Sequence, residues 1–183
     1  PQLECSSAIL VEQSTGKVLY ELDTDVKMPP ASITKIMTLL LVAEAIDSGK
    51  ISFDDVVTAS EEACSMGGSQ IWLEPGEQMS VRDLLKATAT ASANDAAVAL
   101  GEYVAGSHSG FVSMMNQRAK ELGMTNTTFK NANGLDEEGH LTTARDIAIM
   151  SCALMSHDWI TDYTTIWMDE LRGGQTQLVN TNR

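Results

Sequence analysis

Ser32 and Lys35 are two residues whose types and spacing suit nucleophilic chemistry. They lie three residues apart, at the start of a largely apolar run that extends to residue 42. Residues at i and i+3 share one face of a helix, so the hydroxyl and the amine would lie side by side. An apolar helix is buried, and burial disfavours the ammonium form of lysine, which can then accept a proton. The pair therefore predicts an activated serine nucleophile.

The same spacing also occurs where we expect no chemistry. Ser14 and Lys17 are likewise three residues apart, but Gly16 places them in a hairpin turn, where the two side chains need not share a face. For Ser32 and Lys35 the alternative interpretation is a helix cap and a surface lysine. The position of Ser32 and Lys35 at the start of a buried helix distinguishes them from Ser14 and Lys17.

A second candidate site is Ser92-Ala93-Asn94, between the segments LLKATATA and DAAVAL. One predicted helix ends there and another begins, so a hydroxyl and an amide can point from the junction into a cleft. The alternative is that Ser92 or Asn94 only caps the following helix.

These candidates depend on the elements that must position them. Turn residues, capping signals and apolar periodicity predict a mainly helical chain with short strands. The expected elements are a hairpin over 7–22, a helix over 32–48, a short strand within 50–60, a helix opened by Ser80, an alanine-rich helix ending at Gly106, an amphipathic helix closed by Gly123, a polar loop over 126–140, a helix opened by Thr143, another short helix within 158–171, and turn and strand from Arg172.

Composition narrows the classes of protein. A chain of 183 residues suits a single domain, 1–183, and its formal net charge of −13 argues against a nucleic-acid partner. No apolar stretch has the length of a membrane span. The three cysteines and three histidines lack the spacing of metal ligands, so we expect neither a metal nor another cofactor.

Three segments, PASITKIMT, SANDAAVAL and NANGLDEEGHLTTARDIA, occur in an order that resembles one family. The sequence is similar to the penicillin-binding D-alanyl-D-alanine carboxypeptidases of low molecular mass, over nearly its whole length. The resemblance implies an α/β (α+β) fold of the serine β-lactamase and transpeptidase type, in which helices flank an antiparallel sheet beside an all-helical region. It implies two partners, a peptidoglycan stem peptide ending in D-Ala-D-Ala and β-lactam antibiotics, and a location outside the bacterial cytoplasmic membrane.

The resemblance also implies roles for the candidate residues. Ser32 would attack the carbonyl between the two terminal D-alanines, and Lys35 would take the serine proton. Ser92 would pass a proton to the departing D-alanine. Asn94 would hold Lys35 in place and bind the amide backbone of the substrate. The backbone N–H of Ser32 would form part of an oxyanion hole. The loop 126–140 would shape access or, through Asn133 and His140, serve the structure alone.

One departure from the family pattern concerns its third motif, Lys-Thr-Gly or a close variant on a strand. Lys130 is the only lysine after position 120, and Asn-Ala follows it. We therefore expect a chain truncated before that motif, without the later strands of the sheet. A missing C-terminal fragment is then a candidate partner, and any membrane contact would depend on a C-terminal segment outside this chain. Alternatives are a class A-like β-lactamase and a non-catalytic scaffold with the same fold.

Overall fold

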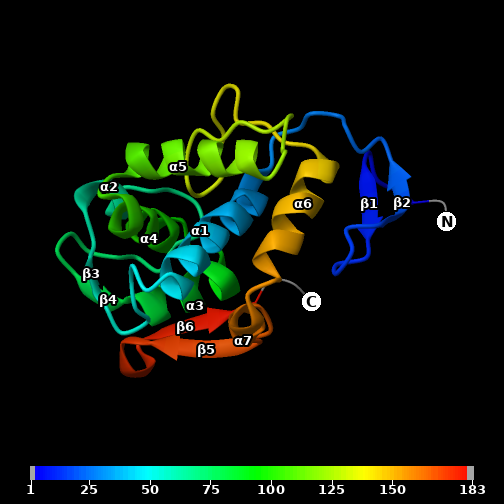
Figure 1. Cartoon of the computed structure of the whole chain (residues 1–183). Helices are drawn as coiled ribbons and strands as arrows, with labels where there is room; N and C mark the ends of the chain where they lie inside the picture. Colours follow the sequence, from blue (N-terminus) through cyan, green and yellow to red (C-terminus); the bar gives the residue numbers. More distant parts are fainter. Residues whose placement is uncertain (1–2, 181–183) are drawn as a thin grey trace.

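The structure is a computed structural model that describes residues 3–180 (Figure 1). The elements follow one another along the chain as β1 (Ala8–Val11), β2 (Val18–Leu22), the 3-10 helix η1 (Ala31–Thr34), α1 (Lys35–Asp47), β3 (Val56–Thr58), α2 (Glu61–Cys64), β4 (Gln78–Ser80), α3 (Val81–Ala91), α4 (Asn94–Ala105), α5 (His108–Glu121), α6 (Ala144–Leu154), η2 (Asp158–Ile160), α7 (Thr161–Thr164), β5 (Met168–Leu171), η3 (Arg172–Gly174) and β6 (Thr176–Val179).

Helix α1 is the centre of the helical body. It packs against α3, α4, α5 and α6, and α6 separates it from the hairpin β1–β2 (Figure 1). Most of its side chains are buried because the segment is apolar around its whole circumference, as the sequence predicts. The largest fully buried side chains of the core come from several helices, the loops between them and strand β6: Met37, Leu40, Leu84, Leu85, Leu100, Phe111, Met115, Met124, Phe129, Met150, Ile160 and Leu178.

In the part of the chain that the structure describes, the named strands occur only as antiparallel pairs, of which β3 and β4 are joined through a connection that contains α2. β1 pairs with β2, β3 with β4 and β5 with β6, each pair antiparallel and each a separate two-stranded sheet. The mixture of helices with antiparallel strands confirms the expected α+β class. The larger central sheet implied by the family resemblance is not completed within residues 3–180.

Capping side chains begin the helices where the sequence predicts. The hydroxyl of Ser80 accepts a hydrogen bond from the backbone N–H of Asp83, and that of Thr143 accepts one from the N–H of Asp146. Helix α4 ends at Gly106, whose φ of 82° is the left-handed conformation that favours glycine. The helices that flank the candidate site therefore have local signals for their ends.

Two segments differ from the expectation. Residues 168–171 form strand β5 rather than part of a helix, because they pair with β6 in a hairpin closed by the turn at 172–174. Ser32 lies in η1 and not in the first turn of the α-helix, which begins only at Lys35. The serine and the lysine nevertheless stay three residues apart across the junction of the two helices.

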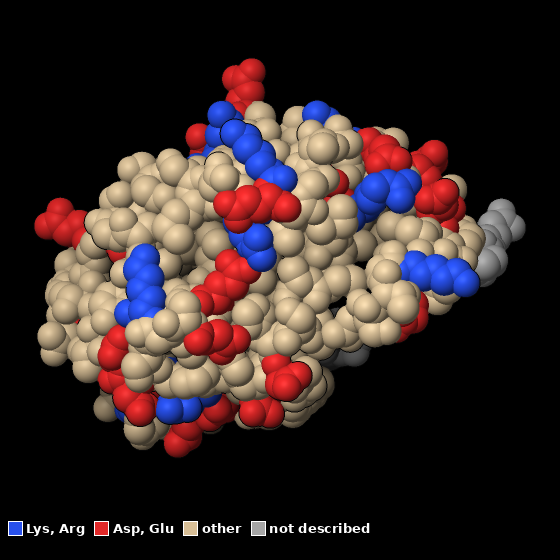
Figure 2. All heavy atoms as spheres, viewed as in Figure 1, with Lys and Arg blue, Asp and Glu red and all other residues tan. Residues whose placement is uncertain are grey.

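The surface carries both signs of charge. Figure 2 shows acidic and basic side chains interspersed on one face rather than gathered in a single basic or acidic area. Within residues 3–180, no helix combines the length and the apolar character that crossing a membrane requires. Over the same residues, no group of three or more His, Cys, Asp or Glu side chains is arranged to hold a metal ion.

Candidate active site

Ser32 and Lys35 are in contact across the junction of η1 and α1. Lys35 Nζ lies 3.3 Å from Ser32 Oγ. The lysine side chain is buried, with 4% of the residue exposed, whereas Ser32 is exposed to solvent. An accessible hydroxyl beside a buried amine is the arrangement that a nucleophile and its proton acceptor need.

The charge state of Lys35 follows from its burial. Removal from water disfavours the ammonium form and lowers the pKa of Lys35 from 10.5 to about 8. Nζ also donates a hydrogen bond to the backbone carbonyl of Asn133, at 2.7 Å. That bond orients the amine, so that the lone pair of its neutral form remains available to Ser32.

Ser92 joins the pair at one cleft. A cleft of about 330 Å³ is lined by Ser32, Lys35 and Ser92 together with side chains of α1, α3 and α6, among them Ile36, Leu39, Thr88, Ser151 and Leu154. Ser92 is the C-cap residue of α3 and has a φ of 56°, in the left-handed region. The junction between α3 and α4 therefore places Ser92 at the same cleft as Ser32.

Asn94 is not among the residues that line this cleft and has other partners than expected. Its side-chain Nδ2 donates to the carbonyl of Gly67 at 2.7 Å, and its backbone N–H donates to the carbonyl of Ser69, also at 2.7 Å. Its Oδ1 is buried and has no hydrogen-bond partner among residues 3–180. The expected hydrogen bond between Asn94 and Lys35 is thus not formed here, and the amine of Lys35 donates to the carbonyl of Asn133. A buried acceptor without a donor is uncommon in folded proteins.

Asp95 anchors the loop that covers Asn94. The Asp95 carboxylate is fully buried and accepts hydrogen bonds from the backbone N–H groups of Ile71 and Leu73, at 3.1–3.2 Å. Between those two residues, Trp72 has a φ of 58° and is 74% exposed. A bulky residue keeps such a conformation only where its surroundings impose it, and here the paired amides on either side do so.

The backbone just before the nucleophile is strained as well. Ala31 has a φ of 47°, and Gly134 lies so close to it that a Cβ at position 134 would overlap the Ala31 carbonyl group. Left-handed backbone at a residue other than glycine costs of the order of 1 kcal/mol or more and is found mainly at functional sites. Among residues 3–180, Ala31 and Ser92 are two of the five non-glycine residues with a positive φ, and both lie in the motif segments.

The other serine–lysine pair is not part of this arrangement. Ser14 is exposed, and its hydroxyl bonds to the carboxylate of Glu12 in the hairpin turn. Lys17 is exposed too. The two serine–lysine pairs therefore differ in the tertiary structure: Ser32 and Lys35 are in contact at a cleft, whereas Ser14 bonds to Glu12.

Sequence reasoning missed the contribution of Asn133, because it acts through its main chain. Neither the carbonyl that receives Lys35 nor the close approach of Gly134 to Ala31 depends on a side chain that a motif would display. The remaining signal was the composition of the segment Asn131-Ala132-Asn133-Gly134, which is typical of a turn.

Comparison with known proteins identifies the family to which this fold and site belong. The D-alanyl-D-alanine carboxypeptidase model of peptidase family S11 matches residues 1–183, and the chain belongs to this family. It is 53% identical over 183 residues to the D-alanyl-D-alanine carboxypeptidase DacF of Bacillus subtilis, an alignment that covers 98% of this chain and 47% of DacF.

Solved structures agree with this assignment. Penicillin-binding protein 6B from Escherichia coli superposes with a TM-score of 0.94 at 34% identity, over 100% of this chain and 59% of that one. Penicillin-binding protein D2 from Listeria monocytogenes, in its cefotaxime-bound form, superposes with a TM-score of 0.86 at 35% identity, over 100% of this chain and 75% of that one. The chain spans about half the length of the curated relatives it matches.

Proposed function

We propose that the protein is a serine-type D-Ala-D-Ala carboxypeptidase, which removes the terminal D-alanine from peptidoglycan stem peptides and is acylated by β-lactams. The observation that carries the proposal is the contact of 3.3 Å between Lys35 Nζ and Ser32 Oγ at the edge of an open cleft. Membership of the carboxypeptidase family and the likeness to a penicillin-binding protein solved with cefotaxime support it.

Acylation begins when Ser32 Oγ attacks the carbonyl carbon between the two terminal D-alanines. Lys35 in its neutral form takes the hydroxyl proton, and the backbone N–H of Ser32 stabilises the oxyanion. Ser92 then gives its proton to the nitrogen of the departing D-alanine as the C–N bond breaks and takes the proton held by Lys35, so that both groups return to their starting state. Water hydrolyses the ester on Ser32, which releases the shortened peptide and restores the serine. The Oδ1 of Asn94 accepts a hydrogen bond from a substrate amide in this scheme.

Residues 1–183 form part of one catalytic domain in this proposal. The sequence contains no Lys-Thr-Gly-type motif, and the curated relatives are about twice as long. Full activity would then need a strand that carries such a motif and binds the substrate carboxylate. A form of the protein that supplies this strand should be acylated much faster than residues 1–183 alone. Because the substrate is cell-wall peptidoglycan, the site of action is outside the cytoplasmic membrane.

The test is intact-mass spectrometry after incubation with benzylpenicillin, followed by peptide mapping. We expect one penicilloyl adduct on Ser32 of the intact protein, absent in Ser32→Ala. Ser14→Ala is the matched control, because it removes the serine of the other serine–lysine pair and should leave the adduct in place. An adduct that persists in Ser32→Ala would overturn the assignment of the nucleophile.

Two further measurements separate the alternatives. A long-lived adduct, with release of D-alanine from an acyl-D-Ala-D-Ala peptide, supports the carboxypeptidase. Rapid loss of the adduct with accumulation of hydrolysed penicillin would instead indicate a β-lactamase. Absence of both acylation and D-alanine release would indicate a scaffold that keeps the fold alone.

A further inference from the structure

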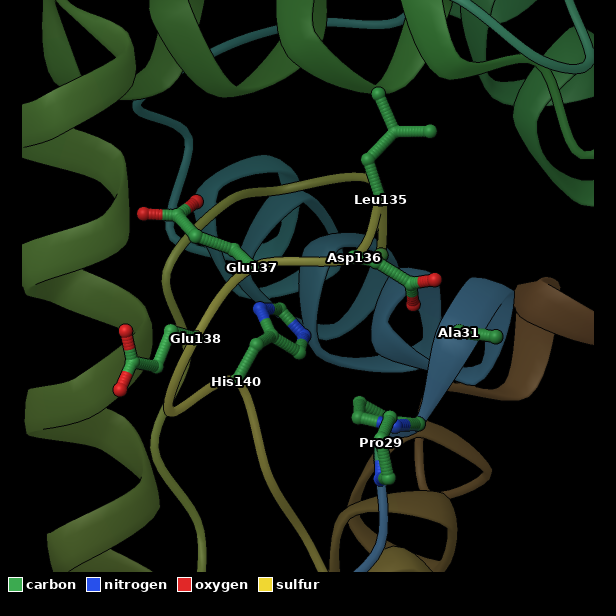
Figure 3. Close-up of a pocket in the computed structure, with 9 residues that line it drawn as sticks. Pro29, Ala31, Leu135, Asp136, Glu137, Glu138 and His140 are labelled. Atoms are coloured by element: carbon green, nitrogen blue, oxygen red, sulfur yellow. The ribbon is translucent and has the colours of Figure 1, made fainter.

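His140 lies between two segments of the candidate active site. It is 3% exposed, and Figure 3 shows it close to the turn that carries Pro29 and Ala31, just ahead of the nucleophile. On one side of the ring, Nε2 lies 2.7 Å from the hydroxyl oxygen of Thr34. On the other side, Nδ1 lies 3.1 Å from the backbone nitrogen of Lys130, whose N–H points at it.

These two contacts determine the protonation state of the ring. A backbone N–H can only donate, so Nδ1 of His140 must accept and carries no proton. The proton of the neutral imidazole is then on Nε2, which donates to Thr34 Oγ1. A doubly protonated ring would place an N–H on Nδ1 against the N–H of Lys130, so the contact to Lys130 would break while Nε2 still donates to Thr34.

The two contacts join the nucleophile to the segment that holds its base. Thr34 lies in η1 between Ser32 and Lys35, so a hydrogen bond to its side chain restrains the backbone that carries both residues. Lys130 lies three residues before Asn133, whose carbonyl receives the amine of Lys35. His140 therefore links the two sides of the Lys35 site through one ring, with a bond to each side.

The charges around His140 act on its pKa in both directions. Burial lowers the pKa of His140 below 6.5, Glu137 and Asp136 raise it, and Lys130 lowers it. Figure 3 shows the carboxylate of Asp136 directed to the side of Ala31, whereas Glu137 and Glu138 point away from the ring. Burial is the largest of these effects, so the neutral ring that the hydrogen bonds require is also the state that its surroundings favour.

A second imidazole holds the same segment from its far side. His108 Nε2 accepts a hydrogen bond of 3.1 Å from the backbone N–H of Ala132, and its Nδ1 lies 2.7 Å from the carboxylate of Glu62. His108 contacts neither Ser32, Lys35 nor Thr34 through a hydrogen bond among residues 3–180. It therefore offers a matched comparison, because it binds the same segment but makes no hydrogen bond to the nucleophile turn.

We propose that His140 is a positioning residue for acylation, which aligns Ser32 and Lys35 only while its ring is neutral. The proposal rests on the proposed function and adds to it a second source of acid sensitivity, distinct from the titration of Lys35. Protonation of His140 breaks the contact of Nδ1 to the backbone N–H of Lys130, and the alignment of nucleophile and base is lost with it.

The experiment measures the rate of acylation of the intact protein by a fluorescent penicillin between pH 5 and 9. The variants are His140→Gln, which keeps an amide donor toward Thr34 without a titratable group, His140→Phe, which fills the space without hydrogen bonds, His108→Gln and His157→Gln. His157 contacts Asp47 at the surface and serves as the control for loss of a histidine elsewhere. Thermal unfolding at each pH shows that every variant stays folded during the assay.

For the wild type we expect the logarithm of the rate to fall with a slope of about one below the pKa of Lys35, and with a slope of about two below that of His140. His140→Gln should keep the slope of about one down to pH 5, whereas His108→Gln and His157→Gln keep the steeper part. His140→Phe should lose roughly tenfold to hundredfold in rate at every pH. A steep part that persists in His140→Gln, or that disappears only in His108→Gln, would overturn the proposal.

A second readout does not depend on activity. In ¹⁵N NMR spectra of the wild-type protein, Nδ1 of His140 should have the shift of an unprotonated nitrogen and Nε2 that of a protonated one, with a common titration below pH 6.5. The opposite tautomer, or a ring already charged at pH 7, would contradict the proposal even if the protein is never acylated. Failure of acylation with the expected tautomer would instead count against the proposed function alone.

Discussion

Gly134 lies against Ala31, and no side chain fits between the two residues. A Cβ at position 134 would overlap the carbonyl group of Ala31, one residue before Ser32, and Gly134 itself has a φ of 88°. The contact fixes the distance between the turn that carries the nucleophile and the segment whose Asn133 carbonyl receives Lys35. It therefore sets the geometry of the candidate site from the main chain.

Gly134→Ala should displace the nucleophile turn. We expect a loss of about a hundredfold in the rate of penicillin acylation, because a shift of about 1 Å at a reacting group has an effect of that size. The measurement is the second-order rate of acylation by a fluorescent penicillin. Gly76→Ala is the control, because Gly76 has a φ of 84° but nothing within 4 Å of its Cβ position. Equal losses in both variants would mean that backbone strain, and not the overlap with Ala31, is responsible.

The pH dependence of acylation should follow Lys35. Its pKa is lowered by burial from 10.5 to about 8. At pH values below 8, each increase of one pH unit therefore raises the fraction of neutral amine about tenfold. The acylation rate should therefore increase with pH and level off above about pH 8. Rate measurements in buffers of constant ionic strength test this. A rate that levels off near pH 6 would show that another group accepts the proton of Ser32.

The free energy of unfolding should also increase with pH because of Lys35. The neutral form is favoured in the folded state, so the contribution of Lys35 is present above pH 10.5 and is lost as the pH falls through about 8. Lys35→Met should remove this contribution and abolish acylation while the protein stays folded, because the burial of a charged amine no longer opposes folding. Urea unfolding at pH 7 should show a midpoint no lower than that of the wild type, and a large drop would mean that the hydrogen bond to Asn133 outweighs the cost of burial.

Asp95→Asn should loosen the loop that carries Trp72. The amide would present a donor to the N–H groups of Ile71 and Leu73, and at least one of the bonds that hold the loop would be lost. We expect faster hydrogen exchange at both amides and a free energy of unfolding lower by about 1–3 kcal/mol. Asp54→Asn, at an exposed carboxylate that pairs with Arg82, is the control and should change neither quantity measurably.

Asp146→Ala should weaken the start of the loop that leads to Asn133. The buried carboxylate accepts hydrogen bonds from the backbone of Asn126 at 2.9 Å and from the hydroxyl of Thr127 at 2.7 Å. Removing it leaves buried donors unpaired, which costs about 1–3 kcal/mol. Thermal unfolding should show a lower midpoint in Asp146→Ala than in the exposed variant Asp158→Ala. Similar midpoints in the two would mean that water replaces the carboxylate.

Much of the secondary structure could be predicted from the sequence because its signals are local. Ser80 and Thr143 cap the helices that follow them, and Gly106 ends α4 in the left-handed conformation. A capping hydroxyl or a glycine acts within one turn of the helix, so its effect can be read without knowledge of the rest of the chain. The segment 168–171 was predicted incorrectly, since its strand exists only through pairing with residues 176–179.

The sequence by itself determined that Ser32 and Lys35 open a largely apolar segment, and the spacing of the two residues, taken together with a helix there, predicted that hydroxyl and amine would be neighbours and the amine buried. Only the tertiary structure decided which serine–lysine pair meets a cleft and what holds the base there. The carbonyl of Asn133 reaches Lys35 across 98 residues of chain, and Asp95 and His140 act through backbone groups of distant loops. Main-chain donors and acceptors are the same in every residue, so their partners are set by packing and not by residue type.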